Sequence, residues 1–225
     1  MNKSYLLNLI LLFIPIVLYF DKKGQAFKDW KALLPAVVIT GIISVVFKMV
    51  LTRYKLVLYD QSTLSGISYF DIPLEAALLC FTVPFAGVVI YAYLNGRYPN
   101  NDFEKYSLAL SNVFLGLSIA IIFFAYTMAY AVITFSLLLL LLFYIEYLNR
   151  YRFMYKFYRA YGVLLVLYAL SQLLFGDQHV AYHIENTMKF NLAGVPFENY
   201  FLLGLHFLSA VYLFEFFKRP GHGLA

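Results

Sequence analysis

The sequence has 225 residues, of which 63% are hydrophobic and only 13% are charged. Soluble domains average about 45–50% apolar and about 25% charged residues, so this composition excludes a soluble globular protein. The formal net charge of +5 does not indicate a nucleic-acid partner, because the basic residues lie in short segments between apolar runs. The single cysteine, Cys80, cannot form an internal disulfide.

Apolar runs of about 20 residues, the length that crosses a bilayer, recur along the whole chain. Seven segments qualify: 4–20, 32–51, 72–94, 106–125, 128–148, 159–175 and 196–217. The first is a retained span and not a signal peptide, because Lys3 alone precedes it and "DKKGQ" follows it, without a small-residue cleavage site. The predicted fold is all-α: a polytopic membrane helical bundle of about seven transmembrane helices, forming one domain over residues 1–225.

The basic residues predict the orientation of these spans. With the N-terminus outside, only five of the 17 Lys and Arg residues lie on the outer side, namely Lys3, Lys48, Arg53, Lys55 and Lys189. The other twelve fall in inner segments, which is a positive-inside bias. This bias predicts that the C-terminus lies inside. The expected location is the bacterial inner (cytoplasmic) membrane.

Two apolar segments begin with a proline followed two residues later by a glutamate. They are "DIPLEAALL", with Pro73 and Glu75, and "GVPFENYFL", with Pro196 and Glu198. A shift of 123 residues superposes these motifs and overlays the last three predicted spans on the first three. We therefore predict a parallel 3+1+3 repeat, with repeat 1 at about 1–97, a connector helix at about 106–125 and repeat 2 at about 128–219, related by an axis along the membrane normal.

The Pro-x-Glu pair has a structural and a functional interpretation. Proline is favoured in the first turn of a helix, and a glutamate there accepts hydrogen bonds from free backbone N–H groups. An ionisable group at membrane depth is costly, however, and its recurrence at equivalent repeat positions indicates a functional role.

Four segments carry a resemblance to a known family. They are "FIPIVLYFDKK", "WKALLPAVVITG", "LSGISYFDIPLEAALLCFTVPFAGVVIY" and "NLAGVPFENYFLLGLHFLSAVYLFEFF". They resemble the small membrane-embedded lycopene cyclases, in the fused two-repeat form. The resemblance implies a carotenoid biosynthesis enzyme, a lycopene cyclase that closes the ends of a linear, lycopene-like carotenoid into β-ionone rings by acid catalysis without a cofactor. No G-x-G-x-x-G dinucleotide motif is present.

The sequence departs from the family motif at several carboxylates. The family usually has a second acid after Pro-x-Glu, where this chain has Ala76 and Asn199. Phe47-Lys48 stands where the family often has Trp-Asp. The family often has Tyr-Glu at the far end of the third span, where this chain has Tyr91-Ala92. At the equivalent position of the second half this chain has Phe214-Glu215.

Two hypotheses follow from these departures. In the first, Glu75 and Glu198 face one another across the repeat axis and act as one acid–base pair. Glu215, 17 residues after Glu198, would then lie about 25 Å farther along its helix and take no part. In the second, the chain is a non-catalytic paralogue that binds a carotenoid or supports other carotenoid-pathway enzymes. A small transporter is a third reading, but no span is broken as a transport site requires.

Other polar residues are candidates for the pocket or its surroundings. His179 and His183 have helical metal-site spacing, but they fall in a predicted loop and we predict no metal site. His183 and Glu185 would instead line the mouth of the pocket, and Asn199 and His206 lie on the last span. Lys48 is expected to extend outward to the interface, or alternatively to neutralise Glu75. The lipid bilayer is the expected environment.

Overall fold

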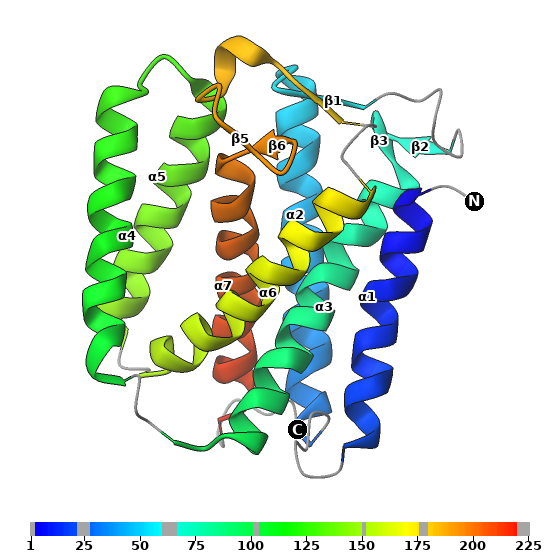
Figure 1. The fold of residues 1–225 in the computed structure, drawn as a ribbon, viewed down its shortest axis with the longest axis vertical. Coiled ribbons are helices and arrows are strands. Elements are labelled where there is room, and N and C mark those ends of the chain that lie inside the picture. The colour runs from blue at the N-terminus through cyan, green and yellow to red at the C-terminus, as the bar shows by residue number, and fades with distance from the viewer. Residues whose placement is uncertain are drawn as a thin grey trace. The chain divides into compact units, whose positions relative to one another are not determined.

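A computed structural model describes residues 3–21, 28–59, 67–100, 104–149, 152–175 and 180–219. About 77% of the described residues are helical. Within these ranges the long helices, labelled in Figure 1, are α1 (Lys3–Phe20), α2 (Trp30–Arg53), α3 (Leu74–Arg97), α4 (Glu104–Phe124), α5 (Ala129–Phe143), α6 (Met154–Phe175) and α7 (Glu198–Phe217). A π-helix, Tyr144–Leu148, continues α5, and a short 3₁₀ helix covers Ile184–Asn186.

Six of the seven helices are long and apolar enough to cross a membrane, and the chain is an integral membrane protein on this ground. The seventh, α1, has 18 residues and is not among the six. The predicted turn at 125–128 is confirmed, because α4 ends at Phe124 and α5 begins at Ala129. The expected number of spans is thus confirmed for six of seven.

The predicted start of the sixth span, residue 159, is wrong. The α6 helix begins five residues earlier, at Met154. Basic and aromatic residues alternate in this segment of the sequence, but Met154, Tyr155 and Phe157 are buried. Burial of these side chains favours helix over the loop that local composition indicates.

The chain divides into two compact units. The first comprises residues 1–49, 61–100 and 206–225, and the second comprises 50–60 and 101–205. The boundaries fall inside α2 and inside α7, and they do not follow the sequence repeats. In the first unit α1 packs along α3, and in the second α4 packs along α5 (Figure 1). The single membrane domain and the 3+1+3 arrangement stay predictions.

The core of the second unit is aromatic. Phe135 and Phe201 lie with their ring centroids 4.8 Å apart, and Phe201 also contacts Phe114 and Phe197 edge to face. Val195, at the end of the last loop, is fully buried in the same cluster. The loop before α7 is therefore part of the packed core of this unit.

Three short antiparallel ladders in the connections correct the all-α prediction. They are β1 (Val57–Tyr59) with β4 (Val180–Tyr182), β2 (Ser68–Tyr69) with β3 (Ile72–Pro73), and β5 (Asn191–Leu192) with β6 (Val195–Pro196). The spans supply the apolar periodicity that sequence reasoning detects, whereas ladders of two or three residues leave almost no period-two pattern.

The repeat is visible in two hairpins that precede α3 and α7. The β2–β3 turn is Phe70-Asp71 and the β5–β6 turn is Ala193-Gly194, which are equivalent under the 123-residue shift. All four turn residues have positive φ, at 51°, 61°, 51° and 85° respectively. Positive φ at both central residues is the type I′ geometry that matches strand twist, so both halves build the same hairpin even where the turn lacks glycine.

The β1–β4 ladder joins equivalent segments of the two repeats. Leu58 pairs directly with Ala181, its own counterpart 123 residues later, and Val57 pairs with Tyr182. The backbone N–H of His183 extends the ladder by donating to the Leu56 carbonyl. A ladder in which a residue pairs with its own equivalent has a local two-fold axis through that pair, so these two short strands are related symmetrically.

Candidate functional site

The two hairpins place the predicted prolines just before the starts of α3 and α7. Pro73 ends β3 and is the N-cap of α3, with φ −62° and ψ 145°, and Pro196 ends β6 two residues before Glu198. Pro73 lies one residue, and Pro196 two residues, before the first residue of its helix. Proline suits the extended position because its φ is already near −65° and it needs no N–H donor there.

Glu75 is a buried carboxyl in the first turn of α3, with 1% of its surface exposed. The Nζ of Lys48 donates to the backbone carbonyl of Ala76, the next residue, at 3.3 Å. The thiol of Cys80 donates to the same carbonyl at 3.4 Å. The ammonium group thus contacts the helix turn that carries Glu75, and both expectations for Lys48, extension to the interface or neutralisation of Glu75, stay predictions.

His206 lies on the part of α7 that belongs to the first unit. Its ring contacts Phe47 edge to face, with centroids 5.8 Å apart. Phe47 directly precedes Lys48 on α2, so His206 contacts the residue next to Lys48 in the sequence. The placement agrees with a packed histidine, and its catalytic use stays untested.

Glu198 is fully buried, at 0% exposure, in the first turn of α7. Its Oε1 accepts the backbone N–H of Met188 at 2.6 Å. Its Oε2 is buried and accepts no hydrogen bond from the residues that the structure describes. The carboxyl thus holds the preceding loop instead of capping its own helix, and one of its oxygens is left for a proton.

Asn199 makes two hydrogen bonds with tyrosines. Its Nδ2 donates to the Tyr182 hydroxyl at 2.6 Å, and its Oδ1 accepts from the Tyr130 hydroxyl at 2.5 Å. The tyrosine rings lie 5.7 Å apart, and Asn199 is only 6% exposed. Sequence reasoning missed both tyrosines, because nothing in their spacing relates a residue at the start of α5 or in the last loop to α7.

The remaining loop candidates do not join Glu198. His183 and Glu185 are exposed, which agrees with a solvated loop more than with a lining of the site. Asp177 and His179 lie outside the described residues. Among the residues that are described, no group of three or more His, Cys, Asp or Glu side chains is arranged to hold a metal.

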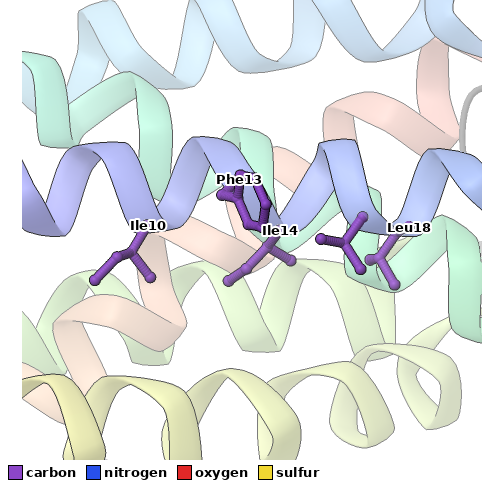
Figure 2. Close-up of a pocket in the computed structure, with 5 residues that line it drawn as sticks. Ile10, Phe13, Ile14 and Leu18 are labelled. Atoms are coloured by element: carbon purple, nitrogen blue, oxygen red, sulfur yellow. The ribbon is translucent and has the colours of Figure 1, made fainter.

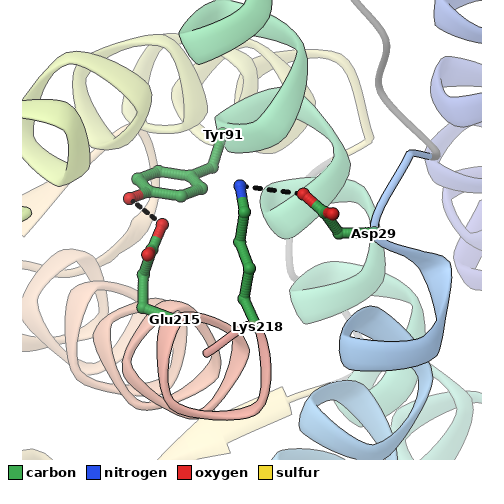
Figure 3. A network of polar contacts seen from close by, with 4 residues as sticks. All are labelled: Asp29, Tyr91, Glu215 and Lys218. Atoms are coloured by element: carbon green, nitrogen blue, oxygen red, sulfur yellow. Dashed lines mark hydrogen bonds and ion pairs between the residues drawn. The ribbon is translucent and has the colours of Figure 1, made fainter. Parts of the chain in front are cut away.

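A second polar network lies in the first unit, between α3 and the last turns of α7 (Figure 3). The Tyr91 hydroxyl donates to Glu215 Oε1 at 2.7 Å, and Lys218 forms a 2.8 Å ion pair with Asp29. The family often has Tyr-Glu at the far end of the third span, where this chain keeps only the tyrosine (Tyr91), and the equivalent position of the second half has the glutamate (Glu215). These two residues bond each other. Glu215 lies 17 residues beyond Glu198 along α7, as predicted.

An apolar hollow of about 390 Å³ runs along α1 (Figure 2). It is lined by Ile10, Phe13, Ile14, Val17 and Leu18. Since no ionisable side chain lines it, this hollow offers no acid–base chemistry.

These features define a class: an integral membrane protein with duplicated hairpin–helix motifs, each of which buries a glutamate in the first turn of a helix. The comparison with known families identifies the class more closely. The chain matches the family described as lycopene cyclase in two blocks, residues 2–94 and 126–217, and it belongs to that family. The blocks coincide with the two repeats. No curated protein and no solved structure matches the chain.

Family membership supports a cyclase-type role in carotenoid biosynthesis within a membrane. Glu75 belongs to the first unit and Glu198 to the second, and their action as a pair stays a prediction.

Proposed function

We propose that this chain is a lycopene β-cyclase-like enzyme, an intramolecular cyclase that converts linear carotenoid end groups to β-ionone rings without a cofactor. The observation that carries the proposal is Glu198: a fully buried carboxyl, anchored through one oxygen, whose other oxygen accepts no hydrogen bond from the described residues. Such a group is a candidate general acid in an apolar site.

The reaction needs one proton donor and one proton acceptor. A carboxylic acid transfers its proton to the terminal double bond, forming a C–H bond and a tertiary carbocation. The next suitable double bond of the same chain attacks the cation and closes the six-membered ring, which moves the positive charge to a ring carbon. Loss of a neighbouring ring proton to a carboxylate leaves the ring double bond, so the reaction is a redox-neutral isomerisation.

We assign the donor and acceptor to Glu75 and Glu198 acting together. Their burial in equivalent hairpin–helix motifs supports this assignment. Neither Ala76 nor Asn199 supplies the second acid of the family motif. Glu75 and Glu198 are therefore the carboxyl groups that this motif retains for proton transfer. Aromatic rings such as those of Tyr130 and Tyr182 would favour the cationic intermediate, by about 0.5–2 kcal/mol each.

A non-catalytic carotenoid-binding or partner-supporting paralogue is the second candidate. One observation favours it. Asn199 occupies the position of a family acid, and both the nitrogen and the oxygen of its amide are hydrogen-bonded to tyrosines. The inner-membrane location, the outside N-terminus and association with other carotenoid-pathway enzymes are part of the proposal under either function.

Expression in a lycopene-accumulating bacterial host separates the two functions. We expect β-carotene or its one-ringed intermediate, detected by chromatography of the pigments. Glu75→Gln and Glu198→Gln should each abolish β-ring formation. Glutamine is the appropriate change at 198, because its carbonyl oxygen can still accept the Met188 N–H while the transferable proton is lost.

Unchanged lycopene in the presence of well-expressed wild-type protein would favour the non-catalytic paralogue. Activity that survives both glutamine substitutions would refute the acid–base pair. Tyr147→Phe is a suitable control, since it removes a tyrosine hydroxyl bonded to Asn112 at the other end of α5.

A further inference from the structure

The loop before α7, residues 180–192, is attached at several points around Glu198, and we call it the cap. Its first strand, β4, pairs with β1. The Met188 N–H is held by Glu198, and the Leu192 carbonyl accepts from the Tyr200 hydroxyl at 3.0 Å. The cap is therefore bonded to β1 and to the start of α7 within the second unit, and it contacts the Glu198 carboxyl through Met188.

Two adjacent residues of α7 hold two different points of this cap. Glu198 holds Met188 at 2.6 Å, and Asn199 holds Tyr182 at 2.6 Å. Neighbouring helix residues project about 100° apart, so the two side chains reach separate parts of the loop. On its other side, Asn199 is fixed by the hydroxyl of Tyr130, which is 1% exposed on α5.

The chemistry of the amide suits this position. Asparagine offers a donor and an acceptor on one short side chain, so it can bond one tyrosine that donates and another that accepts. The chain α5–Tyr130–Asn199–Tyr182–cap is thus continuous, and all of it is electrically neutral. Lys189 follows Met188 in the cap, but its side chain is exposed.

We propose that Asn199 is a positioning residue: with Tyr130 and Tyr182 it fixes the cap over Glu198 and so holds the Glu198 carboxyl in one orientation for proton transfer. This inference rests on the proposed cyclase function. It gives Asn199 a role in turnover where the family motif alone would count it as a lost acid. Proton transfer is sensitive to such placement, since a misplacement of about 1 Å can cost roughly 100-fold in rate.

The test uses Asn199→Leu and Tyr182→Phe in the purified full chain, assayed with lycopene in detergent–lipid micelles. Each should lower kcat about 10- to 100-fold with KM little changed, because the substrate-binding surface is kept while the acid is misplaced. The double variant should be no slower than Asn199→Leu alone, since both changes break the same chain of hydrogen bonds. Asn199→Asp should recover most of kcat, because a carboxylate accepts from both hydroxyls.

Additive losses in the double variant, wild-type kcat in Tyr182→Phe, or an Asn199→Asp variant as slow as Asn199→Leu would each overturn the inference. Tyr147→Phe is the matched control, because it removes a tyrosine–asparagine hydrogen bond of the same kind elsewhere in the unit, and it should leave kcat unchanged.

Hydrogen exchange of the cap supplies a readout that does not need activity. The Met188 amide should exchange faster in Asn199→Leu and Tyr182→Phe than in the wild type or in Tyr147→Phe. If the wild type makes no rings, the cyclase proposal fails, and exchange still shows whether Asn199 fixes the cap. Unchanged exchange of Met188 in both variants would overturn the positioning role by itself.

Discussion

Replacing Gly41 by alanine tests how tightly α2 packs against α3 in the first unit. A Cβ built at Gly41 would lie 2.2 Å from Cδ1 and 2.4 Å from Cε1 of Phe81. Carbon atoms in contact normally lie about 3.5–4.0 Å apart, so the ring has to move by more than about 1 Å. Such overpacking costs about 1–3 kcal/mol, which is roughly a 5- to 150-fold decrease in the folding equilibrium constant.

The free energy of unfolding is measured by titrating the micellar protein with a denaturing detergent and following tryptophan or tyrosine fluorescence. Gly116→Ala is the matched control, because no side chain or backbone atom lies within 4 Å of a Cβ at that exposed position of α4. Alanine is a better helix former than glycine by up to about 1 kcal/mol, so the control should be neutral or stabilising. If Gly41→Ala is as stable as Gly116→Ala, the contact between Gly41 and Phe81 is not present and the packing argument is refuted.

Two further changes test the hairpin turns and the second polar network. Ala193→Gly should raise the free energy of unfolding by up to about 1 kcal/mol, because Ala193 has φ 51° and glycine adopts that region without steric cost; a loss of stability would contradict the turn geometry. Tyr91→Phe should lower the free energy of unfolding by about 1.5–3 kcal/mol, because it removes the hydroxyl that donates to Glu215. Both are measured by the same detergent titration, and a Tyr91→Phe variant of wild-type stability would show that the tyrosine does not hold this carboxylate.

The candidate site could be predicted from sequence only where a motif repeats. Glu75 and Glu198 stand out because each follows a proline at the head of an apolar run, and the 123-residue shift makes them equivalent. Tyr130, Tyr182 and Met188 carry no such mark. Their contacts with residues 198 and 199 span 69, 17 and 10 positions of the chain, and no local periodicity encodes a hydrogen bond between a loop and a helix start.

Equivalent helix pairs of the two repeats also pack by different means. In repeat 1, Gly41 on α2 leaves space for Phe81 on α3. In repeat 2, the counterpart of Phe81 is Gly204 on α7, where a Cβ would lie 2.8 Å from the hydroxyl of Tyr161 on α6. The glycine of the close contact lies on α2 in repeat 1 and on α7 in repeat 2, and this difference is visible only when both members of each pair are placed in space.

The sequence by itself determined that this protein lies in a membrane, where its helices run, and that it is built from two related halves. These properties follow from apolar run length and from a spacing that persists over the whole chain. Only the tertiary structure decided that Lys48 bonds the Ala76 carbonyl at the start of α3, that Glu198 bonds the cap, and that Asn199 bonds two tyrosines. Such choices depend on which donor meets which acceptor once the spans are packed, because burial of a polar group away from water is costly and a hydrogen-bond partner lowers that cost.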